Sequence, residues 1–381
     1  MKKILLSVLA VALSVTVSFA GDLSFVFTER VSYDDNIYFT NEDTESSMIS
    51  TTKLGLNYES LIPSTNISLK AGILGGYNYY MTDPSVNSYF DALVYVSGEH
   101  DYFNVSNTFL FTSDPANSAL TERAERINNT TDLYFISSRD KDFAIGIGGK
   151  NTYDSYIKEE FDYLSRNRID ALVDLFYTVM PKTRLFVNYT HSIIDYSKNE
   201  ANNSSGDSIG LGIKGDLSER ITALAKVSYD MRDYANDKVD SLGNVAENET
   251  SLVGYLVSVK WDPTYSTSLT LSGNRAAQET LYDLNRYYIS TSVSLYASQK
   301  IYDKYSASVL GSYEDMAYPI EIAGSDVLRN DEFLRVRPAV EMEIFENGKI
   351  AVFYEYSTRT SNIEVFEYVN NSTGIEFKFA F

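Results

Sequence analysis

The chain ends in the sequence Gly374-Ile375-Glu376-Phe377-Lys378-Phe379-Ala380-Phe381, and this stretch decides the fold. Successive side chains of a β-strand point to opposite faces. Ile375, Phe377, Phe379 and Phe381 therefore share one apolar face, whereas the residues between them are small or charged. A soluble domain seldom ends on an alternating strand that stops at an apolar aromatic residue. The pattern predicts a terminal strand with one face in an apolar medium.

This strand resembles the C-terminal strand of bacterial outer-membrane β-barrels. In that class, a final phenylalanine with aromatic residues at alternate positions is the signal that the barrel-assembly machinery recognises. The resemblance implies an all-β, antiparallel, up-and-down transmembrane barrel in a Gram-negative outer membrane. It also makes Ile375, Phe377, Phe379 and Phe381 the expected assembly signal.

The N-terminus carries an independent export signal. Lys2 and Lys3 precede an apolar stretch that ends at the small-residue cleavage site Ser18-Phe19-Ala20. The apolar stretch is shorter than the ~20 residues that a membrane-spanning helix requires. We therefore predict a secretory signal peptide at residues 1–20, removed in the periplasm, and a single barrel domain at residues 21–381.

Composition excludes several classes of protein. The chain has no cysteine, so a disulfide scaffold is excluded, and it has 31 Tyr and 20 Phe, which suit strands and barrel girdles. The net charge is −20, and removal of the two signal lysines leaves 30 basic against 52 acidic residues. This balance argues against nucleic acid as a partner and permits a pore that favours cations. The sequence implies no cofactor.

Short breaks recur roughly every 40 residues, the length of one hairpin of two long strands. They are Ile62–Thr65, Glu99–Asp101, Ser138–Lys141, Met180–Thr183, Asp216–Glu219, Asp262–Thr264, Tyr302–Lys304 and Glu346–Lys349. Longer polar stretches alternate with them at Asn41–Ser47, Thr82–Val86, Asp114–Glu122, Lys198–Ser205, Asn236–Asn248 and Pro319–Arg329. Short turns on one side and long loops on the other indicate a barrel of about 18 strands, with 16 as the alternative and the turns in the periplasm. Barrels of this size enclose an aqueous channel.

Alternation assigns charged side chains to the lumen. The candidates are Lys53, Glu59, Lys214, Lys226, Asp230, Lys260, Arg335, Arg337, Glu341, Glu343, Glu355, Glu376 and Lys378. Two interpretations stay open: a charge-lined constriction that selects solutes, and a hydrated wall of cross-strand ion pairs. Tyrosines at segment ends are expected in the outward interfacial girdles: Tyr58, Tyr80, Tyr156, Tyr177, Tyr288 and Tyr356.

The first strand contains the sequence Val31-Ser32-Tyr33-Asp34-Asp35-Asn36-Ile37-Tyr38. It resembles the start of a group of outer-membrane β-barrel porins encoded beside exopolysaccharide genes. The resemblance implies a role in the passage or attachment of secreted polysaccharide. Asp34, Asp35 and Asn36 supply oxygen ligands of the kind that divalent cations prefer. A polar strand end is the favoured interpretation of these three residues, so no metal is predicted.

The two histidines are the candidates for a catalytic base. His100 falls in a predicted periplasmic turn, and His191 shares its parity with the outward Val187 and Tyr189, so it is expected in the aromatic girdle. The adjacent Ser192 points to the other face. Without a base oriented toward a nucleophile, catalysis has no mechanism here, and no enzyme is predicted.

The function that the sequence favours is a porin-like channel for passive diffusion of small hydrophilic solutes, with a cation preference. The alternatives are a barrel that assists export or attachment of exopolysaccharide, and a structural or adhesive barrel with a blocked lumen. The expected partners are outer-membrane lipid and lipopolysaccharide, the assembly machinery, and the solutes or polysaccharide. The sequence does not indicate an oligomeric state.

Overall fold

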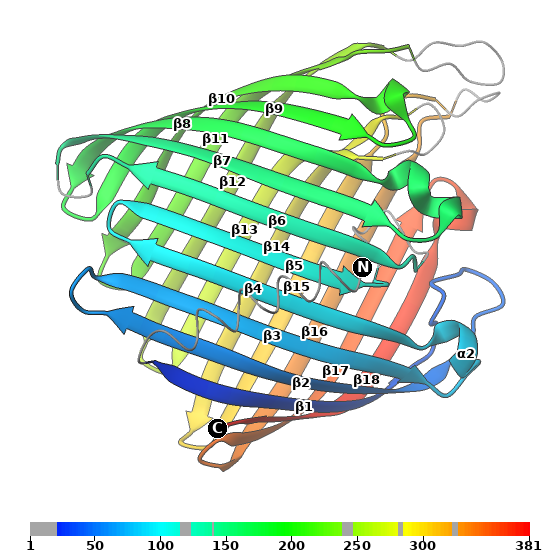
Figure 1. Cartoon of the computed structure of the whole chain (residues 1–381). Helices are drawn as coiled ribbons and strands as arrows, with labels where there is room; N and C mark the ends of the chain where they lie inside the picture. Colours follow the sequence, from blue (N-terminus) through cyan, green and yellow to red (C-terminus); the bar gives the residue numbers. More distant parts are fainter. Residues whose placement is uncertain (1–20, 115–122, 139–140, 238–246, 281–284, 322–326) are drawn as a thin grey trace.

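In the computed structural model, one antiparallel sheet of 18 strands closes on itself into a barrel (Figure 1). The structure describes residues 21–114, 123–138, 141–237, 247–280, 285–321 and 327–381. The predicted fold class and the predicted count of 18 strands are confirmed. The predicted signal peptide, residues 1–20, lies outside the described residues.

The strands follow one another around the barrel in chain order. Their bounds are β1 Asp22–Asp34, β2 Ser47–Ile62, β3 Ile67–Tyr80, β4 Tyr89–His100, β5 Phe103–Thr112, β6 Arg126–Ile136, β7 Phe143–Tyr156, β8 Arg166–Met180, β9 Thr183–Tyr196, β10 Ser204–Ser218, β11 Ile221–Tyr234, β12 Glu249–Thr264, β13 Thr267–Glu279, β14 Tyr287–Tyr302, β15 Tyr305–Ala317, β16 Asn330–Phe345, β17 Gly348–Ser361 and β18 Tyr368–Ala380. Each strand is therefore paired with its neighbours in sequence, and β1 also pairs with β18.

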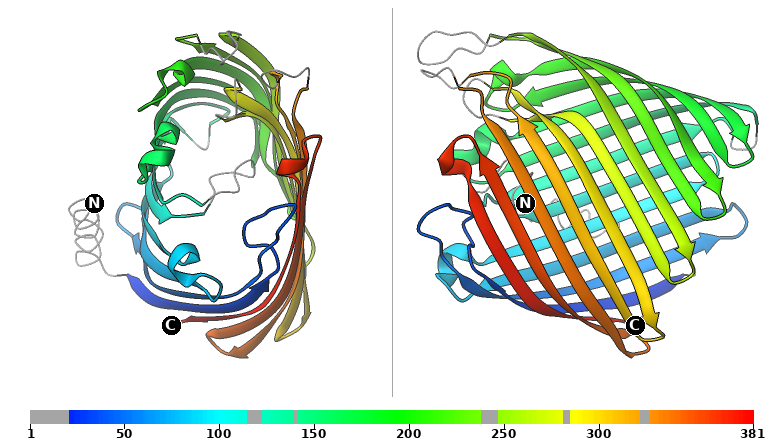
Figure 2. Two further views of the ribbon diagram at one scale, coloured as in Figure 1. Left: turned by 90° about the vertical axis from the view of Figure 1, so that its right-hand side faces the viewer. Right: turned by 180° about the vertical axis from the view of Figure 1, so that it is seen from behind.

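The two ends of the barrel differ. Connections that follow even-numbered strands are short and mark the turn end, where the terminal strand also stops. They overlap seven of the eight predicted short breaks, although residues 139–140 of one break lie outside the described residues. The eighth, Asp262–Thr264, is the irregular end of β12 directly before its turn at residues 265–266. The loop end carries the longer connections, and its described residues include four short helices: α2 Pro84–Asn87, η1 Glu159–Leu164, η2 Glu200–Asn202 and η3 Glu364–Phe366. Seen from the loop end, the barrel has an elongated cross-section (Figure 2).

Alternation along each strand separates the two faces of the wall. On β10, Ile209 and Leu211 are more than half exposed on the outward face, and Gly210 and Lys214 lie on the inward face. An apolar cluster of Ile136, Ala144, Phe176 and Phe186 packs on the inward face of β6 to β9. Among the described residues, no helix is long and apolar enough to cross a membrane.

Strands β1 and β18 close the barrel by pairing from Val26–Ala380 to Asp34–Ser372. Inside the wall, Glu376 accepts hydrogen bonds from the Arg30 Nε at 2.9 Å and Nη2 at 2.5 Å. The Lys378 ammonium lies 2.6 Å from the other carboxylate oxygen. On the outward face, the Phe25 and Phe381 rings lie 5.2 Å apart. A buried carboxylate between two cations therefore reinforces the backbone ladder where the chain ends meet.

We predict that Glu376→Gln destabilises the folded barrel by about 1–3 kcal/mol, because Arg30 and Lys378 then lose their shared anion. The measurement is urea unfolding of residues 21–381 folded in lipid vesicles. Glu59→Gln is the matched control, since Glu59 meets Lys70 at 3.8 Å with both side chains at least half exposed. The control is expected to change stability by less than about 0.5 kcal/mol. Equal losses in the two variants would contradict a special role for Glu376.

Candidate functional site in the lumen

The lumen wall carries the charges that the sequence assigned to it. All thirteen candidate residues lie on the face opposite the exposed apolar side chains. On β12, for example, Trp261 and Val253 are exposed on the outer face, whereas Lys260 lies on the inner face. The structure spreads these candidates over several clusters and does not gather them into one constriction.

Most of the candidates form ion pairs along or between neighbouring strands. The pairs are Arg335–Glu355 at 2.7 Å, Arg337–Glu355 at 3.7 Å, Lys349–Glu341 at 2.8 Å, Lys349–Glu343 at 3.9 Å, Lys260–Asp262 at 3.1 Å and Lys378–Glu376 at 2.6 Å. Lys214 instead places its ammonium 4.3 Å from the centre of the Phe176 ring. Paired charges at partly exposed sites contribute little field of their own, so this pattern favours the hydrated wall of ion pairs.

The turn end of the lumen holds a cavity of about 700 Å³. Three of the predicted residues, Lys260, Glu341 and Glu343, line it together with Tyr296 and Lys349. Tyr296 is 44% exposed although it lies on the inward face of β14. The cavity is therefore a polar vestibule with both signs of charge, wide enough for a small hydrated solute.

The wall is interrupted at the loop end between β12 and β13. The ladder between these strands stops at Tyr255–Arg275. Above that pair, β12 continues to Glu249 against β11, and β13 continues to Glu279 against β14. The two strands therefore separate over their last few residues. The Arg275 guanidinium donates a hydrogen bond of 2.6 Å to the Val253 carbonyl, which satisfies part of the free edge of β12.

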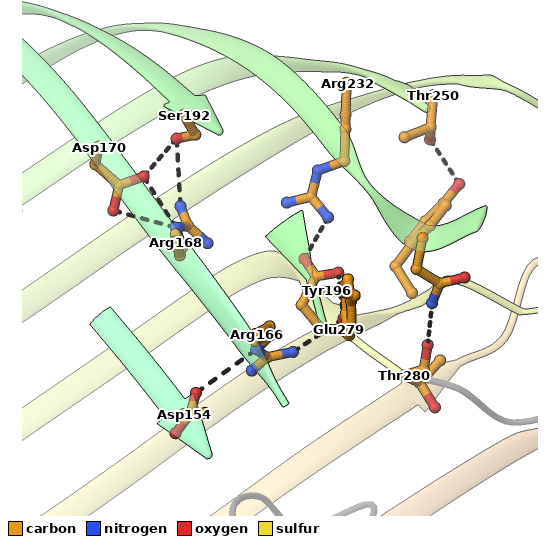
Figure 3. A network of polar contacts seen from close by, with 12 residues as sticks. Asp154, Arg166, Arg168, Asp170, Ser192, Tyr196, Arg232, Thr250, Glu279 and Thr280 are labelled. Carbon is orange, nitrogen blue, oxygen red and sulfur yellow. Dashed lines mark hydrogen bonds and ion pairs between the residues drawn. The ribbon is translucent and has the colours of Figure 1, made fainter. Parts of the chain in front are cut away.

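The end of β13 lies inside the barrel. Glu279 accepts a hydrogen bond from Arg232 on β11 and is within 3.4 Å of the Tyr196 hydroxyl on β9 (Figure 3). Both partners stand on inward faces, so Glu279 must approach them from the lumen. Tyr287 at the start of β14 likewise meets the inward Thr250 at 2.6 Å. We call residues 276–280 and 285–287 the inward hairpin end.

A polar network joins the inward hairpin end to the inner faces of the nearby strands β11, β9, β8 and β7. Arg166 lies 3.2 Å from the Tyr196 hydroxyl and 3.6 Å from Asp154 (Figure 3). Asp154 in turn lies 3.7 Å from Arg126. The side chains of Arg232 and Glu279 are 15% and 7% exposed, so this contact is largely withdrawn from water. The network narrows the lumen at the loop end by holding the inward hairpin end against the inner faces of β9 and β11.

Three predicted girdle tyrosines face the lumen, so their assignment to the outward girdle is wrong. Tyr80, Tyr156 and Tyr288 are 5%, 9% and 1% exposed and lie on inward faces near the loop end. In each of these strands, the outward apolar residues alternate with the tyrosine, so the tyrosine points inward. The position of a residue near the end of a segment does not show this direction. Tyr177 and Tyr356 do share the outward face of their strands, with Leu175 and Val352 as exposed neighbours of the same parity.

Arginines cover the inward tyrosines at the loop end. The Arg123 guanidinium lies 4.5 Å from the Tyr80 ring centre, and the Arg329 guanidinium lies 4.4 Å from that of Tyr318. Burial raises the pKa of the Tyr318 hydroxyl to about 12, so it stays protonated at neutral pH. The aromatic faces are thus occupied by protein cations, and the contacts stiffen the rim.

The Asp34-Asp35-Asn36 segment fastens β1 to β18. Asp34 accepts hydrogen bonds from the Asn36 amide and from Asn370, and Asp35 accepts two from Asn371. The Asn36 side chain donates to the Thr40 and Val369 carbonyls. The described residues contain no group of three or more acidic, histidine or cysteine ligands. The hydrogen bonds of these oxygens therefore hold the strand end, as the favoured interpretation of the three residues expects.

The histidines lie where their sequence positions suggested. His100 stacks on Phe103 at the turn end, and His191 lies on the outward face of β9. The His191 Nδ1 lies 2.9 Å from Asp207 on β10, a partner that the sequence did not reveal, and the Tyr189 hydroxyl donates to the same carboxylate. This outward group points away from the lumen, so it adds nothing to the lumen wall.

Sequence reasoning missed Arg166, Arg232 and Glu279. The two arginines have inward parity and could have been found by the alternation that identified Lys226. Glu279 could not, because its parity in β13 matches the outward Arg275. The end of β13 bends into the lumen. Because of this bend, the face of β13 that would otherwise point outward, which carries Glu279, meets the inner faces of β9 and β11.

A closed, 18-stranded antiparallel barrel with a charged, polar inner wall defines the class of outer-membrane porins. The chain belongs to the family described as Putative beta-barrel porin 2, whose model matches residues 165–381. Its localisation in the outer membrane and its character as a porin follow from this membership. No curated protein sequence matches the chain.

Solved structures of outer-membrane proteins share the fold. Pseudomonas aeruginosa OccK2 (OpdF), solved in complex with glucuronate, has a TM-score of 0.52 at 8% sequence identity, covering 94% of this chain and 98% of that one. Acinetobacter baumannii OccAB3 has a TM-score of 0.50 at 7% identity, covering 95% of this chain and 99% of that one. At these identities the likeness shows the fold alone.

We predict that Glu279→Gln loosens the inward hairpin end, because the loss of one charge-assisted contact weakens it by about 1.5–3 kcal/mol. The expected result is a larger single-channel conductance step in a planar bilayer. Glu343→Gln is the matched control, since it removes an equal charge from the lumen without touching the hairpin end. An unchanged step in Glu279→Gln, or the same increase in the control, would contradict this role of the contact.

Proposed function

We propose that this porin conducts small hydrophilic solutes by passive diffusion. The observation that carries the proposal is the inner wall: ion pairs and hydroxyl groups line it, and they enclose a polar cavity of about 700 Å³ at the turn end. A barrel of 18 strands is wide enough to keep water in its interior. Charged inward side chains require water or partners, so the wall suits hydrated solutes.

No catalytic role is part of this proposal. The His191–Asp207 pair is on the outward face, and the inward carboxylates of Glu355 and Glu341 are paired with arginine and lysine. The barrel fold and the porin family are those of channels. Transport along a concentration gradient needs neither a base nor a cofactor.

A weak preference for cations is part of the proposal. Among the thirteen lumen candidates, seven are basic and six are acidic, so these wall charges nearly cancel. The excess of acidic residues in the chain therefore lies largely elsewhere, and acidic groups around a channel mouth raise the local cation concentration. Because such exposed charges are screened by salt, the preference is expected to weaken as ionic strength rises.

The structure favours diffusion of solutes over the two alternatives, a polysaccharide-associated barrel and a structural or adhesive barrel. A polysaccharide slide would need exposed aromatic faces along the lumen, yet Tyr80, Tyr156 and Tyr288 are buried at the loop end. A structural or adhesive barrel would need a fully blocked lumen. The inward hairpin end is the element that would have to block it.

The test is single-channel recording of the refolded mature protein in a planar bilayer under a salt gradient. We expect stable conductance steps and a reversal potential that favours cations in dilute salt and declines toward zero in concentrated salt. Heat-modifiable migration on a gel verifies that the sample is a folded barrel. A folded sample without steps would overturn the diffusion proposal and favour a blocked barrel.

We also propose that the terminal strand is the assembly signal. Phe381 remains 61% exposed on the outward face, and its backbone pairs with Phe25. Phe381→Ala is expected to lower the amount of barrel in cellular outer membranes while spontaneous refolding in detergent stays near wild type. The comparison uses heat-modifiable protein in both samples. Equal losses in cells and in detergent would instead indicate a purely structural role.

A further inference from the structure

A second cavity, of about 330 Å³, lies beside the inward hairpin end. One side is the inner face of the wall, with Lys226, Ser228 and Asp230 on β11 and Leu252 on β12. The other side is the end of β13, including Asn274 and Gln278. We call this cavity the slot. It exists because β13 leaves its ladder with β12 and bends into the lumen.

Two of the arginines that line the slot are already neutralised by carboxylates. Arg168 pairs with Asp170 at 2.9 Å, and Arg232 pairs with Glu279. Asp207 lies 2.9 Å from His191, and the Arg275 guanidinium, which also lines the slot, donates to the Val253 carbonyl. In the part of the chain that the structure describes, Arg275 and the two β11 charges, Lys226 and Asp230, form no ion pair. Lys226 donates a long hydrogen bond of 3.4 Å to Asn188, and Asp230 accepts one of 3.2 Å from Ser228.

These two opposite charges occupy one side of the slot. Lys226 and Asp230 are four residues apart on β11, so they share the inward face with about 13 Å between their Cα atoms. Both side chains are partly buried. An ammonium and a carboxylate at opposite ends of a small cavity present a dipole, which attracts a solute that carries the reverse arrangement.

Two glycines leave room for these side chains. A Cβ on Gly254 would lie 2.7 Å from the Asp230 Oδ2, and a Cβ on Gly210 would lie 3.2 Å from the Lys226 Cδ. Both glycines are on the strands that flank β11. A larger residue at position 254 would therefore displace the Asp230 carboxylate from its present place.

We propose that the slot binds a short zwitterionic peptide on its way through the channel, with the peptide carboxylate at Lys226 and its ammonium at Asp230. An extended tripeptide spans about 10 Å, and the flexible lysine side chain can cover the remaining distance. Ser192, Ser228 and Thr250 supply hydroxyl groups for the peptide amides, and Leu252 supplies an apolar contact. The site deepens the proposed channel function, because the peptide must first enter the lumen.

The test is calorimetric titration of trialanine into the refolded mature barrel in detergent. Two modified probes accompany it: N-acetyl-trialanine, which lacks the ammonium, and trialanine amide, which lacks the carboxylate. We expect each modified probe to bind at least about tenfold more weakly than trialanine, as the loss of a charged hydrogen bond implies. Equal affinity for all three probes would overturn the proposal.

Variants assign each end of the peptide. Lys226→Gln should abolish the difference between trialanine and its amide, and Asp230→Asn should abolish the difference between trialanine and its acetylated form. Gly254→Ala should weaken trialanine binding while keeping both charges. Lys53→Gln, a lumen lysine outside the slot, is the matched control and should bind trialanine like the wild type. Wild-type binding in both Lys226→Gln and Asp230→Asn would overturn the assignment.

The same preparations are recorded in a planar bilayer, which separates the site from the channel. A barrel that conducts salt but does not bind trialanine overturns the slot and leaves the channel intact. A barrel that binds trialanine with the expected probe dependence but does not conduct supports the slot and overturns the diffusion proposal. Heat-modifiable migration and circular dichroism verify that each variant is folded before it is compared.

Discussion

The closed backbone ladder is the constraint on which the rest of the structure depends. Hydrocarbon offers no partner to a free N–H or C=O group, so a sheet in a membrane must pair every strand on both sides. The pairing of β1 with β18 meets this requirement, and the Arg30–Glu376–Lys378 group lies at that joint. Alternation of the side chains then follows automatically, with apolar residues toward lipid and charged residues toward water.

The ladder between β12 and β13 breaks at the loop end of the barrel, where the requirement that every backbone group be paired is relaxed. It affects only the last residues before the loop end, and Arg275 supplies a donor to the Val253 carbonyl that the ladder leaves free. Because β13 stays paired with β14, the two strands move together as a hairpin into the lumen. The departure from a regular barrel thus creates both the Glu279 contact and the slot, so the features that narrow the lumen share one origin.

The sequence predicted most of the fold because period-two alternation and the spacing of turns are local signals. Residues such as Lys260 and Glu355 could be assigned to the inner wall from their neighbours alone. The wrong or missing predictions concern residues whose placement does not follow from the spacing of their neighbours in sequence. Tyr80 and Tyr156 were placed by position along the segment when parity decided their direction. The His191–Asp207 pair depends on the register between two strands, and Glu279 depends on a bend, neither of which alternation encodes.

The net charge of the chain is a poor guide to the charge of the solutes that the lumen favours. The reason is that most of the candidate lumen charges are paired with a charge of opposite sign. A carboxylate that is held by arginine or lysine, as Glu355 and Glu341 are, contributes little field at a distance. What a passing solute meets is set by the charges that have no partner of their own. In the slot these include one cation and one anion on the same strand, Lys226 and Asp230. Under the proposed channel function, we therefore expect selectivity to depend on the arrangement of a few unpaired groups, and an acidic composition by itself predicts only a bias at the mouth.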